Sequence, residues 1–510
     1  MAPADLPVAT KVFAFATMCV GFFIATLDIQ IVSASLRDIG GGLSAGTDET
    51  AWVQTSYLIA EIIVIPLSGW LSRVMSTRWL FCVSAVGFTI TSLFCGWAWN
   101  IESMIVFRAL QGFLGGSMIP TVFTTAFIYF NGSQRVIAAA TIGCIASLAP
   151  TLGPTVGGWI TDNYSWHWLF FVNLVPGAFV AVVVPMLVRI DRPDPSLLKG
   201  ADYAGMVLMT LFLGCLEYVL EEGERWDWFG DTAIRTAAWI SGISGVLFIW
   251  RSLTHPRPVV DLRALKNRNF GLGSFFSFVT GIGIFATIYL TPLFLAQVRG
   301  FSALQIGLAV FSTGVFQIMA IPLYTFLARR VDLRWLMLVG LLLFALSMWS
   351  FAPITHDWGW RELLLPQAMR GFGQQFAVPP IVTLSLGALA PDRLKLASGL
   401  FNLMRNLGGA IGIAVCGTIL NDRTNLHFLR LAEHLNATNA AMTALLHRVA
   451  ATDGPAKALG LLHSVALREA QTQAYADAFM AILVCFVVAV FLVPLLRKVA
   501  PPAAPSPDAH

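Results

Sequence analysis

Long runs of apolar residues, separated by short polar segments, follow one another along nearly the whole chain. A helix needs about 20 mostly apolar residues to cross the roughly 30 Å of hydrocarbon in a bilayer, and most runs approach or exceed that length. The pattern therefore predicts an all-α integral membrane protein. The fourteen transmembrane helices that we expect lie at residues 12–36, 50–71, 79–99, 103–128, 136–160, 168–188, 203–222, 234–250, 271–296, 302–328, 334–352, 361–388, 397–420 and 475–496.

Composition agrees with a membrane environment and removes other classes of protein. Hydrophobic residues make up 57% of the chain and charged residues 12%, about half the usual 25% of a soluble domain. The net charge of +4 is spread over short loops and forms no continuous basic face, so we exclude nucleic acid as a partner. The seven cysteines all fall in apolar runs without a C-x-x-C pair, which indicates packing roles.

The distribution of Lys and Arg predicts the orientation. An even number of helices puts both termini on one side, and cytoplasmic loops carry the excess of Lys and Arg. The loops on the side of the termini are the richer ones, at residues 73–78, 189–199, 251–268, 329–334 and 393–395. The opposite short loops hold only Arg37, Arg225, Arg235, Arg299 and Arg361. We therefore expect both termini in the cytoplasm.

Three sequence matches at a roughly constant spacing indicate an internal repeat. The segment R-V-M-S-T-R-W-L from Arg73 is similar to R-V-D-L-R-W-L from Arg330. The other two matches pair Arg108 and Gly112 with Arg370 and Gly371, and Gly153 and Gly157 with Gly408, Gly409 and Gly412. Helices 1 to 6 would then correspond to helices 9 to 14, with helices 7 and 8 inserted. Two parallel six-helix halves resemble the plan of major facilitator superfamily (MFS) transporters.

The repeat sets the domain boundaries that we predict. The N-terminal half covers residues 1–190, and a linker with the inserted pair covers residues 191–265. The C-terminal half covers residues 266–497 and contains a long periplasmic loop at 421–474, and residues 498–510 form a cytoplasmic tail. Apolar residues at rough helical spacing in the loop predict amphipathic helices, at Leu426, Leu429, Leu435, Leu445, Val449 and Leu459.

Helix 5 carries the motif L-A-P-T-L-G-P-T-V-G-G, from Leu148 to Gly158. Gly153, Gly157 and Gly158 leave a groove for close approach of another helix, while Pro150 and Pro154 each remove a backbone donor and favour a kink. Ordinary helix packing by small residues is the alternative interpretation. The stretch resembles the G-x-x-x-G-P-x-x-G-G antiporter motif of MFS drug exporters, with Ala149 in place of the first glycine.

Ionisable residues inside predicted spans need a functional or structural explanation. The segment R-A-L-Q-G-F-L-G-G, with Arg108, Gln111, Gly112 and Gly116, is similar to the R-x-x-Q-G motif of the family, whose arginine is linked with proton transfer. An arginine in hydrocarbon is costly and should face the bundle interior and find an acidic or carbonyl partner. A structural ion pair is the alternative. Arg370 and Arg405 also lie inside predicted spans, away from the span ends.

Two carboxylates also fall inside predicted spans. Asp28 lies in A-T-L-D-I-Q-I-V, which resembles the L-D-x-x-I-V signature of fourteen-helix drug:H⁺ antiporters, and Glu61 lies in helix 2. Burial disfavours the charged carboxylate, so such groups can exchange protons near neutral pH. We expect Asp28, Arg108 and Glu61 to form the proton-coupling site in the outer half of the first unit. Glu217, near the end of helix 7, should reach water and lie outside this relay.

The loop after helix 2 departs from the cytoplasmic G-x-L-A-D-R-x-G-R-K motif of the family. Between Gly69 and Arg78, Arg73 stands where the motif has aspartate and Ser76 replaces its second glycine. The corresponding loop after helix 10 keeps Asp332 and Arg334. We therefore expect the acidic element of a cytoplasmic gate in the second half.

Further similar segments over nearly the whole chain identify a resemblance to the EmrB-like branch of the EmrB/QacA antiporters, among them D-Y-A-G from Asp202 and P-Q-A-M-R-G-F from Pro366. The resemblance implies proton-driven export of hydrophobic or amphipathic small molecules across the bacterial inner membrane, with no cofactor besides the proton-motive force and no metal. It also implies a tripartite pump with a periplasmic membrane-fusion adaptor and a TolC-type outer-membrane channel. The 421–474 loop would dock the adaptor or only cap its own bundle.

The sequence leaves one other kind of exporter open and disfavours two other classes of protein. A dedicated exporter of one metabolite, such as an aromatic acid, a fatty acid or a siderophore-like product, has the same sequence features. A membrane-embedded enzyme is disfavoured because the chain has no H-E-x-x-H or G-x-S-x-G arrangement. A sensor would be expected to carry a soluble signalling domain. It is disfavoured because the predicted tails are too short to form one.

Overall fold

The computed structural model describes residues 7–498 apart from residues 34, 388, 391–392 and 435–453, and the described part is helical without strands. Its α-helices are α1 (Val8–Ser33), α2 (Leu36–Gly42), α3 (Thr47–Val74), α4 (Thr77–Gly96), α5 (Ile101–Tyr129), α6 (Gly132–Asn163), α7 (Trp168–Phe171), α8 (Leu174–Leu187), α9 (Tyr203–Glu222), α10 (Thr232–Thr254), α11 (Arg268–Gln297), α12 (Ala303–Leu327), α13 (Leu333–Ser350), α14 (Trp360–Leu386), α15 (Leu394–His434) and α17 (Pro455–Leu492). Short 3₁₀ turns connect some of them, at Pro195–Leu198, Trp228–Gly230, Leu262–Lys266 and Val493–Leu495.

Thirteen helices in the described part of the chain are long and apolar enough to cross a membrane, and α7 with α8 counts as one span, Trp168–Leu187. The fourteenth expected span coincides with α14, which does not meet the same test of apolarity. Buried glutamines, an arginine and three prolines make it more polar than the others. Because α14 packs against α6, α11, α12 and α13, the side chains of Gln367, Arg370, Gln374 and Gln375 are enclosed by protein.

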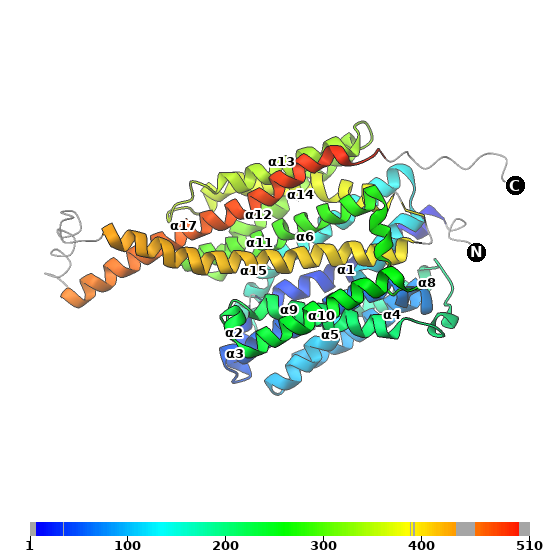
Figure 1. Ribbon diagram of the computed structural model, residues 1–510, viewed down its shortest axis with the longest axis horizontal. Helices are drawn as coiled ribbons and strands as arrows, with labels where there is room; N and C mark the ends of the chain where they lie inside the picture. The colour runs from blue at the N-terminus through cyan, green and yellow to red at the C-terminus, as the bar shows by residue number, and fades with distance from the viewer. Residues whose placement is uncertain (1–6, 34, 388, 391–392, 435–453, 499–510) are drawn as a thin grey trace.

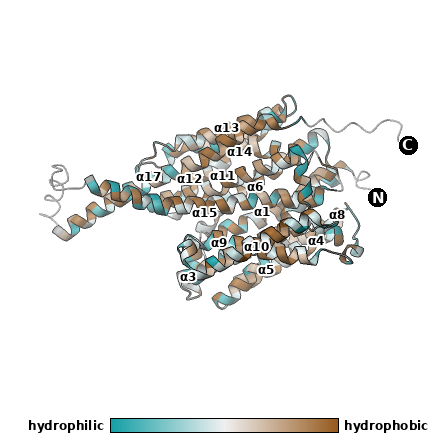
Figure 2. Cartoon of the chain, in the orientation of Figure 1, coloured by the Kyte–Doolittle hydropathy of each residue, from teal (hydrophilic) through white to brown (hydrophobic). Residues whose placement is uncertain are grey.

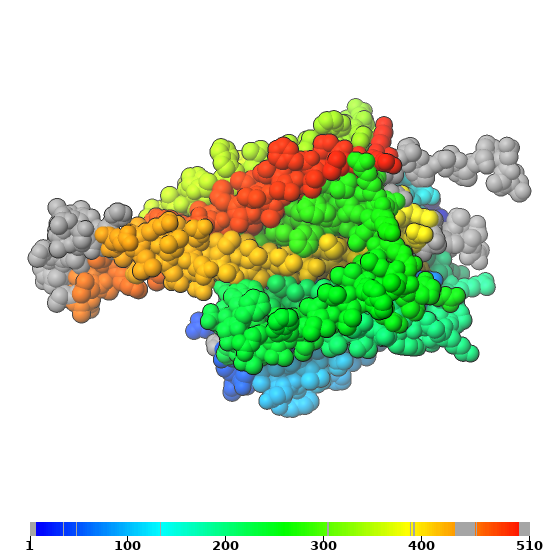
Figure 3. Space-filling model, viewed as in Figure 1, coloured from blue at the N-terminus to red at the C-terminus, as the bar shows by residue number. Residues whose placement is uncertain are grey.

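The segment at residues 421–474, predicted from the sequence to be a loop with amphipathic helices, is helical over much of its described length. Helix α15 runs on to His434 and α17 begins at Pro455, so residues 435–454 separate them. With 41 residues and a rise of about 1.5 Å per residue, α15 is about 60 Å long, twice the hydrocarbon thickness. The extra turns, at residues 421–434 of α15 and 455–477 of α17, form an antiparallel pair that projects beyond the bundle (Figure 1; Figure 3). We call this pair the helical hairpin.

Contacts inside the hairpin are polar and aromatic. The His427 ring lies 2.9 Å from the Asp477 carboxylate, and Phe428 packs edge-on against His463. The predicted helical character holds for Leu426, Leu429 and Leu459. Leu435, Leu445 and Val449 lie outside the described residues.

Helix packing repeats between the two halves of the bundle. In the first half, α3 packs on α5, α1 on α6, α4 on α5 and α8, and α1 on α8 and α5. The second half repeats each pair, with α12 on α14, α11 on α15, α13 on α14 and α17, and α11 on α17 and α14. Helices α9 and α10 pack on each other, and α9 also contacts α3 and α15. The fold therefore consists of two equivalent six-helix halves with an added helix pair beside their junction.

Both described ends of the chain lie at one end of the bundle, since α1 begins and α17 ends there (Figure 1). We call this the terminal end, and the opposite end, where the helical hairpin projects, the hairpin end. Apolar side chains cover much of the bundle, whereas hydrophilic residues gather on the hairpin (Figure 2). The two halves meet mainly where α3 and α5 contact α15 and where α6 contacts α12 and α14.

Candidate functional site

A fully buried ion pair lies inside the first half. Asp28 of α1 and Arg108 of α5 have no exposed surface, and Arg108 Nη1 lies 2.5 Å from Asp28 Oδ2. Two amides complete the environment of the carboxylate, because Gln111 Nε2 and Asn173 Nδ2 donate to Asp28 Oδ1 at 3.2 and 2.6 Å. The carboxylate thus has three donors, which is the arrangement that stabilises its charged form in a low-dielectric interior.

Arg108 is held from several directions. Its Nε donates to the Val53 carbonyl at 3.1 Å, and Nη1 also donates to Gln111 Oε1 at 2.7 Å. The guanidinium lies over the Tyr57 ring at 4.2 Å, a cation–π contact that is strong when desolvated. Its Nη2 has no hydrogen-bond partner in the described part of the chain. Sequence reasoning expected an acidic or carbonyl partner, and the structure supplies both.

Glycines of α5 position α3 beside this cluster. A side chain at Gly112 would collide with the backbone of Tyr57, and one at Gly116 would meet Glu61. Because both pairs are four residues apart, the two helices touch along one matched face. The motif around Arg108 on α5, the fourth predicted span, therefore brings Tyr57 under the Arg108 guanidinium and sets the position of Glu61.

The glycines of the antiporter motif allow α6 to approach α1. A side chain at Gly153 would collide with Gln30, and one at Gly157 with the Ile31 carbonyl, while Gly158 is buried nearby. Pro150 and Pro154 lie inside α6, and Pro154 lines the central cavity. On another side, α6 meets the second half, where Gln317 Nε2 of α12 donates to Ser147 Oγ at 2.6 Å. Helix α6 is thus packed between α1 and the opposite half.

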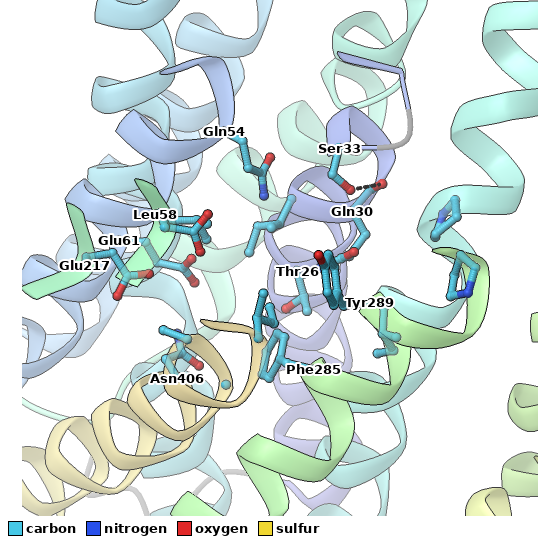
Figure 4. A pocket seen from close by; sticks show the side chains of 18 of the residues that line it. Thr26, Gln30, Ser33, Gln54, Leu58, Glu61, Glu217, Phe285, Tyr289 and Asn406 are labelled. Carbon is cyan, nitrogen blue, oxygen red and sulfur yellow. Dashed lines mark hydrogen bonds between the residues drawn. The ribbon is translucent and has the colours of Figure 1, made fainter. Parts of the chain in front are cut away.

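A cavity of about 550 Å³ lies between the halves, within the size range of pockets for drug-sized ligands. Helices α1, α3, α5, α6, α9, α11, α12 and α15 line it, and most of its wall is apolar. Ser33 and Ala296 lie at or near the ends of α1 and α11, so the cavity occupies the part of the bundle toward the hairpin end. Figure 4 shows Thr26, Gln30 and Gln54 among its polar side chains.

Glu61 belongs to this cavity rather than to the ion pair. Within the described residues, Glu61 forms no hydrogen bond to Asp28 or Arg108. It nevertheless lies within electrostatic range of both side chains. Its neighbours across the junction are Arg405 and Asn406 of α15 (Figure 4). The structure therefore brings Asp28 and Arg108 into contact and places Glu61 at the wall of the cavity, facing the second half.

Glu217 is not at the water-exposed position that we expected from the sequence. Its side chain is only 4% exposed and lines the cavity beside Glu61, together with Glu221 one turn further along α9 (Figure 4). The end of α9 is enclosed because α9 packs against α3 and α15. Spacing from the helix end could not reveal this contact, since it depends on where the inserted pair docks.

Arg370 is the counterpart of Arg108 on α14 but has a different environment. It is 1% exposed, and Nη2 donates to Thr313 Oγ1 at 2.8 Å. Its Nε and Nη1 have no hydrogen-bond partner, and no ion pair to Arg370 occurs, within the described residues. Buried glutamines surround this region instead of a carboxylate. The two halves therefore share the arginine but not the acidic partner.

At the terminal end, the halves are joined by Lys395 and Asp191, which the motif comparison did not identify, and by Gly69, which it did. Lys395 of α15 forms an ion pair with Asp191, which follows α8, and Lys395 Nζ also donates to the Ser72 carbonyl at 3.0 Å. The same Asp191 carboxylate accepts from the backbone N–H of Thr77 at the start of α4, a position that favours negative charge. Gly69 fits directly against the Lys395 backbone.

The other predicted gating residues do not bridge the halves. Asp332 pairs with Arg334 at 2.9 Å within one loop, and Arg334 also donates to the Leu496 carbonyl of its own half. Arg73 is exposed, and Arg78 lies over the Trp79 ring. An acidic gating element in the second half therefore stays a prediction. At the contact between α15 and the first half, Asp191 at the start of the predicted linker supplies the carboxylate.

Two equivalent six-helix halves around a central cavity, with a buried ion pair beside it, define a multi-pass membrane transporter. The family model described as Major Facilitator Superfamily matches residues 18–413 and 273–500. The chain belongs to the Major Facilitator Superfamily, and its relatives are EmrB-like transporters.

Named relatives cover almost the whole chain. The chain is 38% identical over 492 residues to the colistin resistance protein EmrB of Acinetobacter baumannii, covering 95% of this chain and 96% of that protein. It is 30% identical to the fatty acid resistance protein FarB of Neisseria gonorrhoeae, with 97% and 98% covered. The multidrug export protein EmrB of Escherichia coli K12 is also 30% identical, with 86% and 84% covered.

A solved structure shows the same fold at low sequence identity. The proton:xylose symporter XylE, an MFS protein, superposes with a TM-score of 0.61 at 13% identity, covering 96% of this chain and 97% of that one. The likeness supports the fold of the two halves and carries no information on substrate.

Proposed function

We propose that the protein is a proton-coupled exporter of hydrophobic or amphipathic small molecules, with Asp28 and Arg108 as the proton-coupling pair. The observation that supports this proposal is the fully buried Asp28 carboxylate with its three hydrogen-bond donors, beside a mostly apolar cavity of about 550 Å³. The relatives named for colistin, fatty acid and multidrug resistance support export of such compounds.

The coupling follows from competition between hydrogen bonds and desolvation at Asp28. Three donors favour the charged carboxylate, whereas burial favours the neutral acid. Because these two effects are large and opposed, a small displacement of Arg108 or Asn173 changes which form is stable. Helix α1 links this site to the cavity, since Thr26, Ile29 and Gln30 on the neighbouring turns line the cavity wall. Glu61 is the second candidate proton carrier because it faces the cavity itself.

The arrangement of the halves corresponds to an outward-facing state. The excess of Lys and Arg in the loops supports a cytoplasmic location of the terminal end, and the cavity toward the hairpin end would then be on the periplasmic side. The Asp191–Lys395 pair and the close contact of Gly69 with α15 then close the cytoplasmic side. Breaking these contacts while closing the hairpin end would expose the same cavity to the cytoplasm, which is the alternating access that antiport requires.

The proposed location is the bacterial inner membrane with both termini in the cytoplasm. The helical hairpin would then project into the periplasm, with its exposed apolar residues Leu429 and Leu459 available to a partner. We propose a periplasmic membrane-fusion adaptor as that partner and a TolC-type outer-membrane channel beyond it. A dedicated exporter of one metabolite has the same architecture and differs only in the breadth of substrates.

Transport in inside-out membrane vesicles tests this function. The vesicles should accumulate a fluorescent amphipathic compound when respiration acidifies their interior, and addition of a proton ionophore should stop accumulation. Vesicles with Asp28→Asn should remain inactive at equal protein level. Accumulation that persists without a proton gradient would contradict proton coupling. A susceptibility panel in a hypersensitive strain, with the same variant as control, then separates broad efflux from export of one metabolite.

A further inference from the structure

The cavity contains an unpaired carboxylate on the inserted helix pair. Glu217 of α9 is 4% exposed, lines the cavity, and its Oε2 has no hydrogen-bond partner among the described residues. An unpaired buried carboxylate is costly unless it binds a proton or a cation. Figure 4 shows the Glu217 carboxyl group next to Glu61 on one side of the cavity.

The cavity wall carries more acidic than basic side chains. Acidic residues are Glu61, Glu217 and Glu221, and Arg405 is the one basic residue among those that line the cavity in the described structure. Arg405 and Glu61 lie within electrostatic range of each other, whereas no basic side chain of the described residues acts on Glu217 or Glu221 in this way. Among the described residues, neither Glu217 nor Glu221 forms an ion pair with a basic side chain.

The rest of the wall suits the organic part of a ligand. Phe285 and Tyr289 of α11 present aromatic rings to the cavity, and leucine and isoleucine side chains cover most of the remainder (Figure 4). Aromatic faces attract organic cations, and the apolar surface favours the burial of hydrocarbon. An anionic amphipath such as a fatty acid would meet two uncompensated carboxylates in a medium of low dielectric constant.

We propose that Glu217 and Glu221 of α9 form the binding point for the positive charge of an amphipathic cation in the central cavity. The inserted pair α9 and α10 thereby acquires a role in substrate selection, since neither six-helix half supplies these carboxylates. This inference rests on the proposed export function for its physiological meaning, but the binding step itself needs no proton gradient.

Equilibrium binding to the purified full-length protein in detergent tests the proposal. The probes are tetraphenylphosphonium, a lipophilic cation, and triphenylphosphine oxide, an uncharged compound of similar shape. Glu217→Gln should weaken tetraphenylphosphonium binding about tenfold or more, because a buried ionic attraction is lost. Binding of the uncharged compound should change less than twofold. Glu221→Gln, which alters a less buried position, should weaken cation binding in the same direction.

Matched controls separate charge recognition from folding. Glu222→Gln changes a carboxylate on the same helix that bonds to Thr55 at 2.9 Å and does not line the cavity, so it should leave both affinities unchanged. Glu217→Asp should retain most of the cation affinity. Unchanged cation binding in both Glu217→Gln and Glu221→Gln, or equal loss for both probes, would overturn the proposal. Charge-selective binding without proton-driven transport would instead contradict the proposed function and leave this inference standing.

Discussion

Asn173 illustrates how the environment of one carboxylate is built from distant parts of the chain. It follows α7, is 1% exposed, and donates to Asp28 at 2.6 Å and to Ser92 at 3.1 Å. The sequence predicted the buried Asp28 and Arg108 because each carries charge inside an apolar run. Asn173 carries no charge and lies in a segment without such a signal, so only the three-dimensional contact identifies it.

Gly112 is expected to be essential for the contact between α3 and α5. In Gly112→Ala, the added methyl group would meet the Tyr57 backbone, and the two helices would have to separate. Overpacking of this kind costs about 1–3 kcal/mol, so the purified variant should melt at a lower temperature than the wild type. The measurement is thermal unfolding in detergent.

Gly242→Ala is the matched control for this substitution. Gly242 lies within α10, and a side chain there would meet no atom within 4 Å. Alanine is the better helix former, so this variant should melt at or above the wild-type temperature. An equal loss of stability in both variants would show that the close approach at Gly112 is not the cause.

Among the elements, the contact between α15 and the end of the first half closes the terminal end. Asp191 and Lys395 are both partly buried there. We expect Lys395→Asp to reduce transport several-fold because it places two carboxylates together, and Asp191→Lys with Lys395→Asp to recover part of it. Transport rates in vesicles, corrected for protein level, give the interaction between the two positions.

The loop pair Asp332 and Arg334 provides the comparison for this gate. Both residues belong to the second half and pair with each other, so Asp332→Asn should leave transport near the wild-type rate. A loss as large as that of Lys395→Asp would return the gating role to the second half, as the motif alone suggested. The motif could not show Asp191, because its carboxylate comes from the connection after α8 rather than from the loop between α3 and α4.

The helical hairpin is predicted to contact a periplasmic adaptor. Leu429 and Leu459 are 62% and 61% exposed on its two helices, so both side chains are accessible to a partner. Photo-crosslinkers at these two positions should capture the adaptor in cells with active efflux. A crosslinker at Leu247 of α10, on the bundle surface, serves as the control. Efflux without capture at the hairpin would support a role confined to its own bundle.

Hydrophobic periodicity predicted most helix positions within a few residues but not the length of the hairpin. Its helices continue beyond the apolar part of the span, where polar and apolar residues alternate irregularly, so hydropathy alone marks an early end. Contacts such as His427 with Asp477 join two segments far apart in sequence and stabilise these extensions. The division at residues 190 and 265 stays a prediction, although the repeated packing of the two halves is compatible with it.

For the whole molecule, the orientation in the membrane decides which end of the cavity faces the substrate. Reporter fusions after Leu198, after Lys266 and at the C-terminus should report cytoplasm, because they belong to the loops rich in Lys and Arg. A fusion at Gly454, which directly precedes α17 at the tip of the hairpin, should report periplasm. A cytoplasmic signal at Gly454 would reverse the assignment of the cavity to the outer side.

Proton release on substrate binding tests the coupling role of Asp28 most directly. Addition of a transported compound to the purified wild-type protein in weakly buffered detergent should release protons, because substrate and proton compete for the same states of the carrier. Asp28→Asn keeps the shape of the side chain but cannot titrate, so it should bind an uncharged substrate and release no proton. Full proton release by well-folded Asp28→Asn would contradict the coupling role of Asp28 and transfer it to Glu61.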